Sequence, residues 1–176
     1  MAGDIKSKYP AASTAMTVTN LHSLASSQTW IGGWTSASVA NTSNVDFDYL
    51  VGGTFTTHAS NRQAGSINVY VIGSLNDTPT WPTSASGTPG TEGALTFTAA
   101  EQVNSCCRLL GSIAVNNTAS QVYAFPQTSI AQLFANQVMP THWCLYVASN
   151  ASTTTTAGLA AAGSALYYTR VIAQYT

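Results

Sequence analysis

Charged residues are scarce in this sequence. Its 176 residues include 5 Lys and Arg and 6 Asp and Glu, which together make up 6% of the chain. In globular proteins about a quarter of the residues are charged. Because net charge helps a free monomer to stay soluble, the formal net charge of −1 favours a protein whose surface is buried against other subunits. An extracellular, lectin-like domain is the alternative class with such a composition.

The small number of Lys and Arg residues also limits the kinds of partner that the protein can bind. The chain has no run of Lys or Arg, so it lacks the electrostatic footprint of a protein that binds nucleic acid or an anionic membrane. No apolar run approaches the ~20 residues of a membrane span, and Met1–Tyr9 lacks the apolar segment of a signal peptide. We therefore expect no nucleic-acid partner, no membrane partner and synthesis in a cytoplasm.

Cysteine and catalytic motifs are equally sparse. The 3 cysteines are Cys106, Cys107 and Cys144, which make neither an even disulfide framework nor a CxxC metal site. We expect them to be buried, inert thiols. The sequence has no GxSxG, HExxH, phosphate-loop or dinucleotide motif. The 6 acidic residues supply few carboxylates for metal ligands or for a catalytic acid–base pair. We therefore expect that the protein is not an enzyme and binds no metal or cofactor.

Short β-strand patterns, separated by Gly, Pro and Asn, fill most of the chain. They are rich in β-branched and aromatic residues, which favour strands. The predicted strands cover residues 16–24, 28–34, 45–57, 66–72, 109–115, 121–125, 143–148 and 165–173. We expect strands 109–115 and 121–125 to form a hairpin, with Asn116 and Asn117 at its turn.

The clearest alternation lies at the start of the strand predicted at 45–57. Its apolar positions are Val45, Phe47, Tyr49 and Val51. Since successive side chains of a strand point to opposite faces, we expect these residues to face the core. Asp46 and Asp48 would then lie together on the solvent or subunit face.

These patterns predict an all-β fold: an antiparallel β-sandwich, of jelly-roll type, formed by a single domain at residues 17–176. One short helix is expected from Ser129 to Phe134, because Ser129 can cap it and the apolar residues behind it have helical spacing. Residues 1–16 form an extended N-terminal arm, or else a frayed end. Residues 75–93, rich in Pro and Gly, form a long loop.

Four residues are candidates for protein–protein contact. Lys6, Lys8 and Tyr9 lie in the arm, which in an assembly would lie on a neighbouring subunit. Trp81 is predicted to be exposed in the 75–93 loop. Trp and Tyr supply large contact areas at interfaces.

The chain resembles a group of small virion structural proteins of tailed bacteriophages. The segments that carry the resemblance are, in chain order, Ile5–Tyr9, residues 12–15, Thr17–Thr19, Leu24–Ser27, Asn41–Val51, Gly65–Ile72, Arg108–Gly111 and Met139–Trp143. Some jelly-roll proteins of this size are head decoration, or cement, proteins. The resemblance thus implies a protein on the capsid exterior, made in the host bacterial cytoplasm. Its partners would be the major capsid protein and further copies of itself, as a homotrimer or dimer.

Two other functions remain open. A tail or head-fibre module would bind a host receptor or glycan by stacking Trp81, Trp30 or Trp34 on sugar rings, although the chain has no shaft-like repeat. A glycan hydrolase using Asp46 and Asp48 is a weaker alternative.

Overall fold

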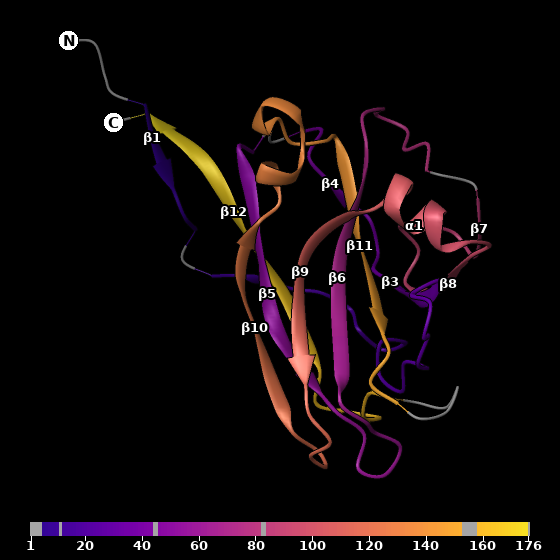
Figure 1. Ribbon diagram of the computed structural model, residues 1–176. Helices are drawn as coiled ribbons and strands as arrows, with labels where there is room; N and C mark the ends of the chain where they lie inside the picture. Colours follow the sequence, from indigo (N-terminus) through magenta and orange to yellow (C-terminus); the bar gives the residue numbers. More distant parts are fainter. Residues whose placement is uncertain (1–4, 11, 44–45, 82–83, 153–157, 176) are drawn as a thin grey trace.

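The structure is a computed structural model that describes residues 5–10, 12–43, 46–81, 84–152 and 158–175. Its named strands form two antiparallel sheets (Figure 1). This confirms the predicted all-β antiparallel sandwich, while the jelly-roll topology stays a prediction. Among the described residues, no helix is long and apolar enough to cross a membrane.

The first sheet contains both ends of the described chain. Its strand order is β1-β12-β5-β10, and β2 also pairs with β12. The bounds are β1 Ile5–Lys8, β2 Thr14–Ala15, β5 Asp48–Thr56, β10 Val122–Ser129 and β12 Ala165–Tyr175.

The second sheet has the order β7-β8-β3-β11-β6-β9, and β4 also pairs with β11. The bounds are β3 Gly32–Thr35, β4 Val39–Ala40, β6 Gly65–Ser74, β7 Ala85–Ser86, β8 Gly93–Phe97, β9 Arg108–Val115 and β11 His142–Ser149. The predicted strands at 66–72, 143–148 and 165–173 are confirmed as parts of β6, β11 and β12.

The second sheet is covered on both faces. All eight residues of β11 are buried, and they alternate between two hydrophobic clusters. Trp143, Leu145 and Val147 join the cluster between the sheets, whereas Cys144 and Tyr146 join a cluster on the outer face. A strand covered on both faces has no need of polar alternation, which explains the continuous apolar run at 143–148.

The outer face of the second sheet is covered by α1 (Ala100–Cys106) and by parts of neighbouring loops. The sequence did not predict this helix, because Val103 is its only buried residue and no apolar periodicity results. The helix expected at Ser129–Phe134 is wrong. Ser129 ends β10, and two short 3-10 turns follow at Ala131–Leu133 and Ala135–Gln137.

The predicted hairpin of 109–115 and 121–125 is also wrong. β9 pairs with β6 in the second sheet, whereas β10 pairs with β5 in the first. The chain therefore crosses from one sheet to the other after Val115. Leu110 of β9 and Phe125 of β10 meet in the cluster between the sheets, so each strand has the alternation that a hairpin would also show.

Two strand boundaries differ from the prediction. Residues 16–24 do not form a strand, and 19–23 form a turn. The N–H of Leu21 donates to the carbonyl of Val18 at 3.1 Å, and Leu21 and Leu24 are buried. β5 begins only at Asp48, so the alternation does not reach Phe47, which is 51% exposed. Val45 lies outside the described residues.

Candidate interaction surface

The first and last strands form a two-stranded ribbon at the edge of the first sheet. β1 runs antiparallel to the end of β12, with Ile5 opposite Tyr175 and Lys8 opposite Ile172. We call β1 and residues 172–175 the terminal ribbon. Figure 1 shows it projecting from the body of the molecule. Ile5–Lys8 of the expected arm is thus extended and paired with the chain's own β12, while the arm's contact with a neighbouring subunit stays a prediction.

Every side chain of β1 is exposed. Ile5 is 71% exposed, and Tyr9, the residue after β1, is 58% exposed. Ordering a residue costs about 1–2 kcal/mol, whereas a backbone hydrogen bond contributes about 1 kcal/mol net. Without buried apolar surface these two effects nearly cancel, and isolated two-stranded ribbons are marginally stable. β1 is therefore held only weakly by β12.

Exposed aromatic residues flank β12 at the base of the ribbon. The N–H of Phe47 donates to the carbonyl of Val171 at 2.8 Å, which places Phe47 beside β12 on the β5 side. Tyr9 follows Lys8, which lies opposite Ile172 on the other side. The base of the terminal ribbon therefore carries apolar surface suited to protein contact.

An ion pair between a buried carboxylate and a partly exposed arginine anchors β12 where the ribbon begins. Arg170 Nε lies 2.7 Å from Asp46 Oδ2, and Arg170 Nη2 lies 2.8 Å from Oδ1. The Asp46 side chain is 1% exposed and that of Arg170 35%. Burial acts to raise the pKa of Asp46, but hydrogen bonds from Arg170 and Tyr49, together with the charge of Arg170, outweigh burial and lower this pKa below its ordinary 3.8. The expectation that Asp46 lies on a solvent or subunit face is wrong, because the carboxylate pairs inward with Arg170.

The Asp48 carboxylate accepts hydrogen bonds from backbone N–H groups. Its Oδ1 accepts the N–H of Tyr49 at 2.7 Å and the N–H of Ala131 at 2.8 Å. A glycosidase needs one carboxylic acid with a raised pKa beside a second carboxylate. Asp46 has a lowered pKa and an Arg partner, so these two aspartates lack the arrangement that the hydrolase alternative requires.

Trp81 is partly buried rather than exposed. It packs against the outer cluster of the second sheet, close to Gly90: a Cβ on Gly90 would lie 2.8 Å from Cζ2 of Trp81. Gly90 also has φ +80°, a conformation that favours glycine. Trp81 therefore forms part of the cover over this sheet, and its role in protein contact stays a prediction. Residues 82–83 of the 75–93 loop lie outside the described part.

The other tryptophans offer no open stacking platform. Trp34 and Trp143 are fully buried, and Trp30 is partly buried against the outer cluster. Trp34 Nε1 donates to Glu92 Oε1 at 2.8 Å. The expectation that Trp34 stacks on a sugar ring is therefore wrong, which weakens the glycan-binding alternative.

An apolar groove of about 340 Å³ lies between the start of β9 and the turns after β10. Leu75 and Val138 in its lining are 77% and 62% exposed. Arg108 lines the same groove, and its side chain makes no hydrogen bond or ion pair to another described residue. Sequence reasoning did not single out this groove, although Leu75 is a large apolar residue at the start of a predicted loop.

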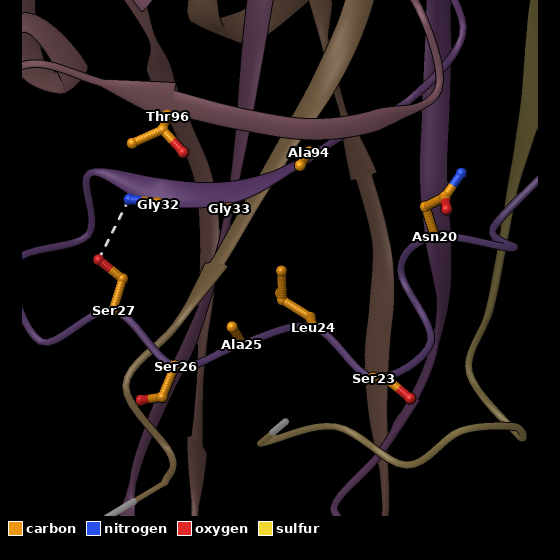
Figure 2. A pocket seen from close by; sticks show the side chains of 10 residues that line it. All are labelled: Asn20, Ser23, Leu24, Ala25, Ser26, Ser27, Gly32, Gly33, Ala94 and Thr96. Carbon is orange, nitrogen blue, oxygen red and sulfur yellow. Dashed lines mark hydrogen bonds between the residues drawn. The ribbon is translucent and has the colours of Figure 1, made fainter. Parts of the chain in front are cut away.

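A second pocket, of about 250 Å³, is lined by the turn at 20–27 and by strands β3 and β8 (Figure 2). The N–H of Gly32 donates to Ser27 Oγ across one end, at 3.1 Å. The lining contains small polar side chains and Leu24, and no charged residue. It offers hydrogen bonds but no acid or base for catalysis.

The thiols and histidines have structural surroundings. Burial raises the pKa of Cys107 and of Cys144 to about 12, so both stay protonated at neutral pH. Among the described residues, no three His, Cys, Asp or Glu side chains are grouped so that they could hold a metal ion. His58 Nδ1 accepts the N–H groups of Ser60 and Asn61, each at 3.0 Å.

The predicted contact residues fall in two places. Lys6 and Lys8 lie on β1 of the terminal ribbon and Tyr9 directly follows β1, whereas Trp81 belongs to the cover of the second sheet. β1, at one edge of the first sheet, and β7, at one edge of the second, lie on opposite sides of the molecule in Figure 1. A scan against protein-family models and searches of curated proteins and of solved structures found no match. Function is therefore inferred from these surfaces and from the resemblance noted in the sequence.

Proposed function

We propose that this chain is a structural protein of a tailed-phage virion, a decoration or cement protein. It binds the outside of the head and bridges subunits of the major capsid protein. The observation that carries the proposal is the terminal ribbon, a strand pair that projects from the body and whose β1 side chains are all exposed. Such an element gains stability when a neighbouring protein covers it.

The ribbon has the chemistry of a contact surface. Lys6 and Lys8 are one strand period apart, so their side chains leave the same face of β1. They attract acidic side chains on a capsid subunit, while Tyr9 and Phe47 supply apolar contact area.

Bridging requires a second contact surface away from the first. The groove of Leu75, Val138 and Arg108 supports this requirement, because it lies beside β9, at an edge of the second sheet, whereas the ribbon lies at an edge of the first. Its apolar lining and the guanidinium of Arg108, which has no side-chain partner among the described residues, suit an apolar segment that also carries a carboxylate.

The mechanism is mass action without chemistry. A protein that binds the assembled shell and not its separated subunits stabilises the shell at each site by RT ln(1 + [L]/Kd), where [L] is the concentration of the free protein. The composition assists this binding, because Thr, Ser, Asn and Gln are desolvated more cheaply than Lys or Glu. Because 6% of the residues are charged, few charged side chains have to be desolvated when the surface is covered by a partner.

The test is binding to heads that lack the protein, measured by co-sedimentation. Lys8→Gln should weaken binding by up to about fivefold, the effect of one exposed ion pair. Arg62→Gln, which removes the same charge from the loop before β6, should not. Deleting residues 1–9 should abolish most of the binding. If the truncated protein decorates heads normally, the ribbon is not the contact.

Trp81 needs a separate test because it also supports the fold. Trp81→Ala should lower head occupancy if the ring touches the capsid, and circular dichroism must show that the sheets persist. Unchanged occupancy would restrict Trp81 to its packing against Gly90 and the outer cluster.

A further inference from the structure

We infer that β1 is exchanged between copies of this chain, so that the β1 of one protomer pairs with the β12 of another. The inference concerns the isolated protein and does not rest on the proposed function. It starts from the edge of β12 at residues 172–175, which we call the seat. There β1 pairs with β12 through four residue pairs, from Ile5 opposite Tyr175 to Lys8 opposite Ile172. Every copy carries the same seat, so a neighbour's β1 fits it in the same register.

The connection to the rest of the chain permits the exchange. β2 pairs with Tyr167 and Tyr168 of β12, and Ser13 Oγ lies 2.7 Å from Thr169 Oγ1, so the chain is anchored from Ser13 onward. Only the segment between Lys8 and Ser13 has to change direction. It contains Pro10, and a residue before proline favours an extended backbone, which suits an arm that reaches away from its own body.

Withdrawal of β1 also breaks few contacts within the protomer. β1 lies at the edge of the sheet with β12 as its neighbour, and its four side chains are exposed. Withdrawing β1 therefore disturbs neither hydrophobic cluster, since no residue of β1 belongs to either. Exchanges of this kind need only a detachable element and a neighbour with the same seat.

A second copy is the occupant that the surface favours. In the closed protomer Ile5, Tyr9 and Phe47 stay exposed, so apolar surface at the ribbon is available for contact with a second copy. The formal net charge of −1 gives weak repulsion between copies. Addition of a second β1 to the outer edge of the first is disfavoured, because Lys6 and Lys8 are the kind of residues that protect an edge strand from pairing.

Cysteine crosslinking between different chains tests the exchange. Ser7 lies opposite Ala173 in the register. A Ser7→Cys chain and an Ala173→Cys chain, both with Cys106→Ser, are unfolded, mixed and refolded together, then treated with a short bifunctional thiol reagent. The control mixture pairs Ser7→Cys with Leu75→Cys, since Leu75 is well exposed and belongs to neither strand of the ribbon.

Exchange predicts a covalent heterodimer in the first mixture, forming on the order of 100-fold faster than in the control because the two thiols are held at millimolar effective concentration. Peptide mapping should join the segments of Ser7 and Ala173. Crosslinking no faster than in the control, or links between two Ser7 positions, would overturn the inference.

Light scattering supplies an independent measurement. The full chain should have the mass of two or more protomers, and the chain without residues 1–9 the mass of one, with unchanged circular dichroism. A full chain that is monomeric at micromolar to millimolar concentration would also overturn the exchange. Neither result depends on whether the protein binds a phage head, so failure here leaves the proposed function standing.

Discussion

The ion pair at the base of the terminal ribbon should respond sharply to the loss of one partner. Arg170→Met keeps the length of the side chain but leaves the Asp46 carboxylate, 1% exposed, without its two charged donors. Breaking a fully buried pair costs about 3–5 kcal/mol. Because Arg170 is 35% exposed, water can reach Asp46 in the variant, and we expect about 2 kcal/mol at pH 7.

This loss should depend on pH. In the wild type the pKa of Asp46 lies below 3.8, so the stability from the pair is present above this value and is lost as the pH falls through the folded-state pKa. In Arg170→Met burial dominates and raises the pKa of Asp46, so the variant regains stability as the pH falls toward 4. The difference between the two proteins should therefore shrink on acidification.

Thermal unfolding followed by circular dichroism measures both effects. A loss of about 2 kcal/mol corresponds to a fall in Tm of roughly 4–8 °C for a chain of this size. The double variant Asp46→Asn, Arg170→Met should be more stable at pH 7 than Arg170→Met alone, because no unpaired charge remains. A loss below about 0.5 kcal/mol, the range of an ordinary surface substitution, or one that is equal at pH 7 and pH 4, would refute the account of this pair.

Three further predictions concern the outer layer, the thiols and the turn after β10. Gly90→Ala should destabilise the fold by about 2 kcal/mol, from the positive φ and the contact with Trp81, whereas Gly32→Ala, with no neighbour closer than 3.7 Å, should cost less than half as much in chemical denaturation. A thiol reagent should modify Cys106 in the native protein but not Cys107 or Cys144, whose pKa values are raised by burial; fast labelling of Cys106→Ser would contradict this assignment. Asp48→Ala should cost about 1 kcal/mol through the two lost backbone contacts, and Asp48→Asn, which keeps an oxygen acceptor, should cost less; equal losses would show that charge, not the acceptor, matters.

The strands with unambiguous patterns could be predicted from the sequence. β6, β11 and β12 each contain a dense run of β-branched and aromatic residues, and their predicted cores lie inside the observed strands. The all-β class followed from these runs. The pairing partners did not, because Leu110 and Phe125 show the same alternation whether their strands form a hairpin or face each other across the core.

The candidate site was predictable only in part. Lys6, Lys8 and Tyr9 were expected in an extended arm, and the structure places Lys6 and Lys8 on the exposed β1 and the exposed Tyr9 directly after it. The sequence could not show that Asp46 turns inward, since its partner Arg170 lies more than a hundred residues away. Nor could it show that Trp81 is covered, since that depends on the close approach of Gly90.

The central claim is that this protein decorates a phage head. It is tested most directly by counting its copies in purified virions by quantitative mass spectrometry, relative to the major capsid protein. We predict a number of copies comparable with that of the major capsid protein, as binding at many equivalent shell sites requires. A few copies per particle would contradict the claim and would place the protein in the tail or a fibre.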